Sequence, residues 1–205
     1  MKPRLVFLRP RNADNLVAIA ETMARFGLSE WVVVSPVVHL ETMRDVLRSH
    51  RAPNPFSAQV ERVRRVDSLA EAVEGCTWVV GTTMRAFESL PHFEPRELAA
   101  HAPDAPWALV FGAEANGMTN DDLAQCHAIS SLPSSEEQPS LNLAQAMLLY
   151  AYELSASSHP EFRAAMSQRF GDEAAGLSAP LLRGGLSERE AASWARAVRA
   201  AEKPL

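Results

Sequence analysis

The sequence is short of cysteine and has no long apolar run. Its two cysteines, Cys76 and Cys126, lie far apart and form no Cys-x-x-Cys pair, which argues against a disulfide framework and against a zinc site. The six histidines show no metal-ligand spacing. The apolar run over residues 5–8 is too short for a signal peptide or a membrane span. We therefore expect a cytoplasmic protein that binds neither a metal nor a membrane.

Several common nucleotide and hydrolase motifs are also missing. The chain contains no G-x-G-x-x-G and no G-x-x-x-x-G-K-S/T, which argues against NAD or ATP as its main ligand. It contains no G-x-S-x-G, the turn that carries the nucleophile of many serine hydrolases. The formal net charge of −5 argues against wholesale wrapping of nucleic acid but is compatible with a local basic patch. Arg4, Arg9 and Arg11 lie close together near the start of the chain.

The chain does have the composition and periodicity of a globular α/β domain. With 205 residues, 47% of them hydrophobic and 22% charged, it is long enough for one sizeable core. Strands alternate with helices, which predicts a mostly parallel sheet covered on both sides. Asp14 or Asn15 is expected to cap the first helix and Ser68 the third. The predicted strands are 4–8, 31–34, 58–66, 77–81, 107–111 and 128–132, and the predicted helices are 12–27, 40–50, 68–74 and 140–157.

The last of these helices has apolar residues beyond those that one small domain needs. Its apolar stripe is joined by Tyr150 and Tyr152, so we expect the helix to take part in a dimer. Beyond it the composition becomes rich in Ala and Arg. We expect a domain over residues 1–157 followed by a short helical extension over residues 158–205.

Three loops leave the carboxyl ends of predicted strands and mix small with polar residues. They span residues 81–85, 111–117 and 132–143. Open parallel sheets bind ligands beyond the carboxyl ends of their strands, and glycine lets a ligand approach the backbone closely. These loops are therefore the predicted ligand site.

Three motifs in this chain resemble those of the SpoU/TrmH family of RNA 2′-O-ribose methyltransferases, within the SPOUT superfamily. The first is the strand-to-helix turn PRNADN over residues 10–15. The second is ALVFGAEANGMT over residues 108–119. The third is SLNLAQA over residues 140–146, followed by YEL over residues 152–154. The motifs stand in the family's order, and the resemblance covers residues 5–154.

The resemblance implies a fold, a cofactor and a substrate. Family members fold as a Rossmann-like, mostly parallel sheet whose C-terminal part is tied in a trefoil knot. They bind S-adenosylmethionine in the knot, dimerise through it and methylate a ribose 2′-hydroxyl of RNA. We therefore expect a homodimer whose partner is tRNA or rRNA, with the cofactor held largely by backbone groups of the three loops. By this match, the cofactor-binding residues are Thr82, Thr83, Gly112, Gly117, Leu132, Leu141 and Leu143.

The resemblance also implies which residues act on the RNA. The Asn of the family's first motif falls on Asn15, and the Glu, Ser and Asn of the other two motifs fall on Glu114, Ser140 and Asn142. Simpler roles remain open: Ser140 could only cap its helix, and Asn142 and Glu114 could be buried hydrogen-bonding partners that fix the knot. The predicted RNA-binding residues are Arg9, Arg11 and Arg85.

One position departs from the family. Six residues after the first-motif Asn, active members carry an Arg that is thought to activate the ribose hydroxyl, whereas this chain has Glu21. A carboxylate there could accept the hydroxyl proton, but it would also repel the RNA backbone. Glu21 also stands four residues before Arg25, so it could form an ordinary ion pair on the helix surface. Two functions stay open: an active 2′-O-methyltransferase, and a catalytically impaired dimer that binds RNA or cofactor without methyl transfer.

Overall fold

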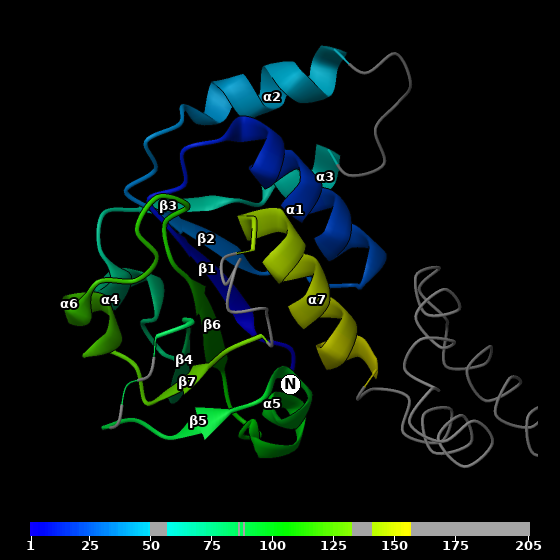
Figure 1. Cartoon of the computed structure of the whole chain (residues 1–205). Helices are drawn as coiled ribbons and strands as arrows, with labels where there is room; N and C mark the ends of the chain where they lie inside the picture. Colours follow the sequence, from blue (N-terminus) through cyan, green and yellow to red (C-terminus); the bar gives the residue numbers. More distant parts are fainter. Residues whose placement is uncertain (50–56, 86, 88, 133–140, 157–205) are drawn as a thin grey trace, which may run out of the picture.

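The structure is a computed structural model that describes residues 1–49, 57–85, 87, 89–132 and 141–156. Within these residues the chain forms a seven-stranded parallel sheet in the order β3-β2-β1-β6-β4-β7-β5 (Figure 1). The α/β fold class with a parallel sheet is thus confirmed. The strands are β1 (Arg4–Leu8), β2 (Trp31–Val34), β3 (Arg64–Val66), β4 (Trp78–Thr82), β5 (His92–Phe93), β6 (Trp107–Phe111) and β7 (Ala128–Ser130).

The strand order reverses at β1, which pairs with β2 on one side and with β6 on the other. Leu5 lies opposite Trp31 of β2 and opposite Leu109 of β6. Next to β6 come β4 and then β7, so the carboxyl ends of these three strands are neighbours at one edge of the sheet. This arrangement brings together three loops that are far apart in the sequence.

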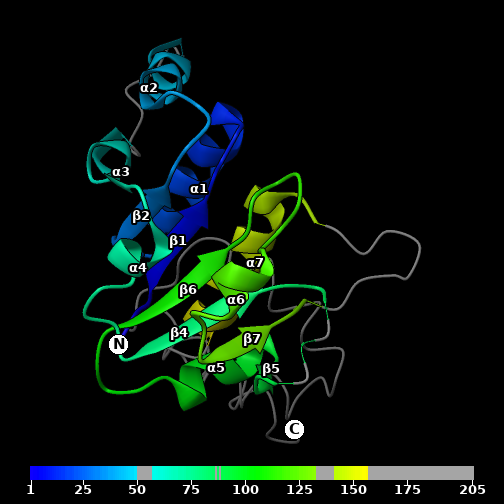
Figure 2. The same cartoon turned by 90° about the vertical axis from the view of Figure 1, so that its left-hand side faces the viewer.

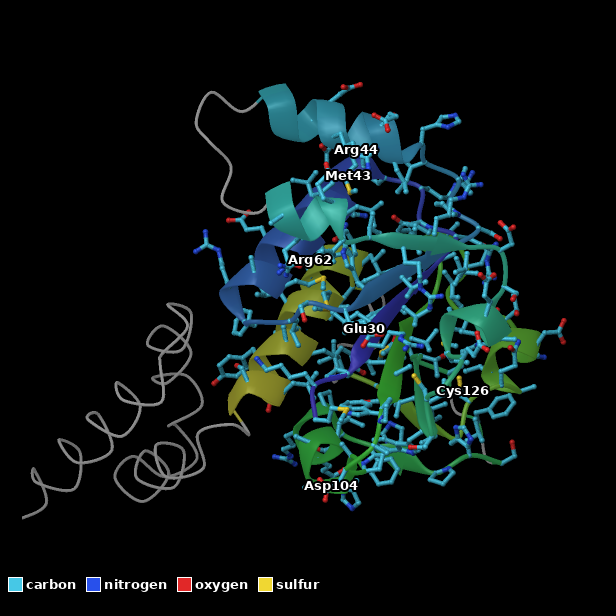
Figure 3. The ribbon with its side chains drawn as sticks, turned by 180° about the vertical axis from the view of Figure 1, so that it is seen from behind. Glu30, Met43, Arg44, Arg62, Asp104 and Cys126 are labelled. Atoms are coloured by element: carbon cyan, nitrogen blue, oxygen red, sulfur yellow. The ribbon has the colours of Figure 1, made fainter. Side chains whose placement is uncertain are left out.

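Helices cover both faces of the sheet (Figure 1 and Figure 2). They are α1 (Ala13–Arg25), α2 (Leu40–Ser49), α3 (Ser57–Glu61), α4 (Leu69–Ala72), α5 (Pro95–His101), α6 (Asn120–Leu123) and α7 (Leu143–Ala156). One hydrophobic cluster joins α1, α2, α3, α5 and α7 to the sheet, and a second joins α4 and α6 to its other face. Met43 belongs to the first cluster and Cys126 to the second, and Figure 3 labels both. The five residues of β6 are all buried because both faces of the sheet are covered.

The strand predicted over residues 58–66 is wrong in its first part, where the chain forms helix α3 and only β3 remains as a strand. Gln59 lies inside this helix and is buried. Its side-chain Nε2 donates to the carbonyl oxygen of Leu28 at 3.1 Å, and its backbone carbonyl oxygen accepts from Trp31 Nε1 at 2.9 Å. The partners that stabilise this helix lie about thirty residues away, so the local pattern gave no sign of them.

The helix caps agree with the sequence in one of two cases. Ser68 caps α4 as predicted, accepting the N–H of Glu71 at 3.2 Å. Helix α1 is capped by Asn12, whose side chain accepts the N–H of Asp14 at 2.8 Å, so the predicted caps Asp14 and Asn15 lie inside its first turn. Three short elements, β5, α5 and α6, have no counterpart among the predicted ones.

Helix α7 presents different apolar residues to solvent from those expected. Tyr150 is 1% exposed and donates from its hydroxyl to Oγ of the buried Ser130 at 3.0 Å, and burial raises the pKa of that hydroxyl. Leu148 and Leu149 are instead exposed. Tyr150, one of the two tyrosines expected to contribute to a dimer, is therefore buried within the domain, and the dimer stays a prediction.

Two predictions fall on residues outside those that the structure describes. The predicted trefoil knot is one of them, because it involves segment 133–140, which lies between β7 and α7 in the sequence. The helical extension over residues 158–205 is the other. Both stay predictions.

Candidate functional site

The three loops that follow β4, β6 and β7 line one cavity of about 360 Å³. Their strands are neighbours in the sheet, so the loops meet although up to fifty residues separate them. The structure brings together all seven residues of the predicted cofactor site, since each of them lines this cavity: Thr82, Thr83, Gly112, Gly117, Leu132, Leu141 and Leu143.

The loop after β6 is closed tightly upon itself. Ala113 donates its N–H to the carbonyl oxygen of Gly117 at 3.1 Å, and Gly117 returns the bond to Ala113 at 2.8 Å. Gly117 has φ +65°, a conformation that favours glycine. A Cβ at Gly112 would lie 2.3 Å from the carbonyl carbon of Gly117 and 2.4 Å from the backbone nitrogen of Met118. The loop therefore has this shape only because residue 112 carries no side chain.

The apolar wall of the cavity comes largely from α7. Leu143, Ala146 and Tyr150 line the cavity together, and their spacing of three and four residues places them on one helix face. Leu132, at the start of the loop after β7, is buried. The sequence analysis missed Ala146 and Tyr150, which the spacing from Leu143 could have revealed.

A chain of hydrogen bonds joins the three motifs. Asn142 donates from Nδ2 to Oδ1 of Asn15 at 3.0 Å. Asn15 in turn donates from its own Nδ2 to Oε1 of Glu114 at 3.2 Å. The second carboxylate oxygen of Glu114 accepts the backbone N–H of Arg11 at 3.0 Å. Asn15 is buried, so its amide is held in one orientation by an acceptor on one side and a donor on the other.

Asn142 also begins helix α7. Its side-chain Oδ1 accepts the N–H of Ala144 at 2.8 Å, which satisfies one of the free donors at the helix start. One side chain thus serves both the helix and the hydrogen-bond chain. Ser140, the other predicted residue of this motif, lies outside the described part of the chain.

A second cavity of about 550 Å³ adjoins the first. Both are lined by Glu114, Leu141 and Leu143, so the Glu114 carboxylate stands at their junction. Asn15 and Asn142 line the second cavity only, together with the exposed Arg11. The site therefore has one compartment built from loop backbone and a second built from hydrogen-bonding side chains.

Glu21 is not part of either compartment. It lies on α1 and accepts from Arg25 through Nε at 3.2 Å and Nη2 at 2.6 Å. Its side chain is 42% exposed and lines neither of these two cavities. The Glu21–Arg25 ion pair, one of the two roles open for Glu21 from the sequence, is thus present.

Two of the three arginines predicted to bind RNA have partners within the chain. Arg9 forms an ion pair with Asp122, and Arg85 donates to Met118 and Asn120. Burial alone would raise the pKa of Asp122, but hydrogen bonds from Arg9 and from Thr119 bring it below its ordinary value. The structure contains no RNA, so RNA binding by these residues stays a prediction.

The described residues contain no group of three or more His, Cys, Asp or Glu that could hold a metal ion. Across the same residues, no helix is both long and apolar enough to cross a membrane. The two cysteines form no disulfide.

The fold and the site define a class of protein: an open parallel α/β domain with a ligand cavity at the carboxyl ends of three neighbouring strands. Residues 2–152 match the SpoU rRNA Methylase family, so the chain belongs to that family. The family predicted from the three motifs is confirmed.

Individual relatives agree with this assignment. The chain is 38% identical to the tRNA (cytidine/uridine-2′-O-)-methyltransferase TrmJ of Pectobacterium atrosepticum over 74% of its own length and 63% of that protein. It therefore spans less than two thirds of that relative. A solved structure of a probable methylase family protein from Haemophilus influenzae is 27% identical, with a TM-score of 0.66 and coverage of 97% of this chain and 95% of that one. The crystal structure of TrmJ from Z. mobilis ZM4 is 25% identical with a TM-score of 0.64, over 98% of this chain and 90% of that one.

Proposed function

We propose that this chain is an S-adenosylmethionine-dependent methyltransferase that acts on a ribose 2′-hydroxyl of RNA, with tRNA as its substrate class. The observation that carries the proposal is the junction of the two cavities at Glu114. One cavity suits a cofactor, and the adjoining one suits the acceptor nucleotide. The name of the Pectobacterium relative supports tRNA as the substrate. An RNA substrate and two free thiols are consistent with work in the cytoplasm.

The loop cavity fits S-adenosylmethionine. Its volume of about 360 Å³ lies within the range of about 300–1,000 Å³ that small-ligand sites occupy. Leu132 and Leu143 offer apolar contact to an adenine, and the missing side chain at Gly112 leaves loop backbone at the cavity wall. When bound, the cofactor supplies an electrophilic methyl group.

The second cavity holds the residues proposed to orient the acceptor nucleotide. Asn15, Glu114 and Asn142 present amide and carboxylate groups of fixed orientation, which suit hydrogen bonding to ribose hydroxyls. Arg11 is exposed at this cavity and is proposed to bind a phosphate of the RNA. The role predicted for Ser140, which lies outside the described residues, stays a proposal.

The test is transfer of labelled methyl from the cofactor to RNA isolated from cells that lack the gene. We expect label in the tRNA fraction, recovered as 2′-O-methylated nucleosides, and little in the rRNA fraction. Absence of label from all RNA, with cofactor binding confirmed by calorimetry, would contradict the transferase. That result would favour the alternative of a dimer that binds without transfer.

We expect Glu21→Ala to leave the affinity for S-adenosylmethionine unchanged. The exposed i,i+4 pair with Arg25 contributes about 0.3–0.5 kcal/mol, so the free energy of unfolding should change by no more than that. Calorimetry and chemical denaturation measure the two quantities. Loss of methyl transfer in Glu21→Ala at unchanged cofactor affinity would instead identify Glu21 as the proton acceptor. An inactive native chain in which Glu21→Arg creates methyl transfer would support the alternative function, a dimer that binds RNA or cofactor without methyl transfer.

We also propose a homodimer formed through the exposed apolar residues of α7 and of its start. Leu141, Leu148 and Leu149 are 39%, 43% and 41% exposed, and leaving such surface in water is unfavourable. Sedimentation at micromolar concentration should give twice the chain mass of 22.4 kDa. The double variant Leu148→Glu/Leu149→Glu should sediment as a monomer. A native chain that sediments as a monomer would overturn this proposal.

A further inference from the structure

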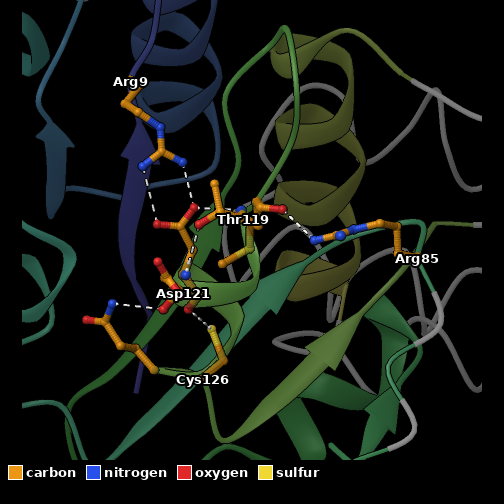
Figure 4. Close-up of polar contacts among 8 residues, drawn as sticks. Arg9, Arg85, Thr119, Asp121 and Cys126 are labelled. Carbon is orange, nitrogen blue, oxygen red and sulfur yellow. Dashed lines mark hydrogen bonds and ion pairs between the residues drawn. The ribbon is translucent and has the colours of Figure 1, made fainter.

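The segment that follows the cofactor loop is held from two sides by arginines. Figure 4 shows Arg9 on one side of Thr119 and Arg85 on the other. Arg9 comes from the end of β1, and Arg85 comes from the loop after β4. Both strands are sheet neighbours of β6, which leads into the cofactor loop. The two cations therefore connect that loop to the strands on either side of it.

Arg9 binds Asp122 through both ends of its guanidinium. Nη1 lies 3.2 Å from Oδ1 and Nη2 lies 2.6 Å from Oδ2 (Figure 4). The same Oδ2 accepts the backbone N–H of Thr119 at 2.7 Å, and Thr119 Oγ1 accepts the N–H of Asp122 at 3.1 Å. This capping box starts α6 directly after Met118. The bidentate pair thus fixes the backbone at the exit of the cofactor loop.

Arg85 reaches the same segment from the cavity side. Its Nη2 donates to the carbonyl oxygen of Met118 at 2.6 Å, and its Nη1 donates to Oδ1 of Asn120 at 3.1 Å. Met118 is the residue after Gly117, whose N–H and carbonyl close the loop on Ala113. A guanidinium that donates two bonds to one short segment restricts both the position and the rotation of that segment.

We propose that Arg9 and Arg85 are positioning residues that hold loop 112–118 in the shape that binds the cofactor. The proposal rests on the proposed function of the loop cavity as a cofactor site. It replaces the RNA contact expected of these two residues from the sequence. The charge of Arg9 is balanced by Asp122, which leaves it little net attraction for a phosphate. Arg11, which is exposed and lines the second cavity, keeps its proposed contact with the RNA.

The test measures cofactor and RNA affinity separately for Arg85→Ala, Arg85→Lys and Arg11→Ala. We expect Arg85→Ala to weaken S-adenosylmethionine binding by about tenfold, because Met118 and Asn120 lose their donors together. Arg85→Lys should recover part of this loss, since an ammonium can still donate to the Met118 carbonyl. Arg11→Ala is the matched control: it should weaken RNA binding and leave cofactor affinity unchanged.

Hydrogen exchange without cofactor separates positioning from direct contact with the ligand. In Arg85→Ala the amides of Ala113 and Gly117 should exchange faster than in the native chain, because their mutual hydrogen bonds lose support. For Arg9, whose removal leaves Asp122 buried and unpaired, the double variant Arg9→Ala/Asp122→Asn should show the same faster exchange.

Two results would overturn the inference. One is Arg85→Ala with unchanged cofactor affinity and weaker RNA binding, which would make Arg85 an RNA contact. The other is unchanged exchange at Ala113 and Gly117 in both variants. If the native chain binds no S-adenosylmethionine, the proposed function fails, and the exchange measurement still decides whether the arginines position the loop.

Discussion

Gly112→Ala is expected to weaken binding of S-adenosylmethionine by at least about 100-fold, or about 2.7 kcal/mol. The added Cβ would lie 2.3 Å from the carbonyl carbon of Gly117 and 2.4 Å from the nitrogen of Met118. Backbone atoms cannot rotate away as a flexible side chain can, so loop 112–118 has to open. Calorimetry on the native and variant chains measures the loss, and circular dichroism shows whether the fold persists.

Two other glycines separate this steric effect from backbone strain. Gly117 and Gly75 have φ of +65° and +77°, and a Cβ at either would meet nothing within 4 Å. Alanine at either position therefore costs only the strain of the left-handed conformation, about 1–2 kcal/mol. Gly75→Ala, away from the cavity, should lower Tm and leave cofactor affinity unchanged. If Gly112→Ala binds cofactor as well as Gly75→Ala does, the loop is not the cofactor wall.

The second large effect is expected at Asn142, where aspartate should reduce methyl transfer by about 10- to 100-fold while preserving the helix. An aspartate carboxylate still accepts the N–H of Ala144, so the start of α7 stays capped. It cannot donate to Asn15, however. Asn15 then has a carboxylate on each side, at position 142 and at Glu114, and it can turn its NH2 group toward only one of them, so its Oδ1 faces the other carboxylate without a donor. A buried polar group left without its hydrogen bond costs about 1–3 kcal/mol, here in the cavity proposed to hold the acceptor nucleotide.

Comparison with Asn142→Ala distinguishes the two roles of this side chain. Alanine removes both the cap and the donor to Asn15, so it should also reduce the free energy of unfolding by about 1 kcal/mol. Steady-state transfer to tRNA, together with thermal denaturation, gives both quantities for each variant. Full activity in Asn142→Asp would show that the residue serves only the helix.

Elements whose pattern is set by burial could be predicted from the sequence. Strands β1, β2 and β6 have the predicted bounds, because a strand buried on both faces reads as a continuous apolar run. The seven cofactor-site residues also meet as expected, since loops at the carboxyl ends of neighbouring parallel strands share one edge of the sheet. The family resemblance added the identity of the expected ligand, S-adenosylmethionine.

Other features depended on partners that no local pattern contains. Helix α3 replaced part of a predicted strand because Gln59 hydrogen-bonds to Leu28 and Trp31. Tyr150 faces the interior, where its hydroxyl donates a hydrogen bond to the buried Ser130. In each case a tertiary contact outweighed a weak local preference.

The fold class, the family and the loops that line the first cavity could all be predicted from the sequence. The hydrogen bonds of individual polar side chains there depend on the tertiary structure. Arg9 and Asp122 are 113 residues apart, and Asn15 and Asn142 are 127 apart, yet each pair shares a hydrogen bond. Burial follows from apolar periodicity, which is a local property of the chain. A hydrogen bond requires two groups at a set distance and angle, and for distant residues only the folded chain provides them.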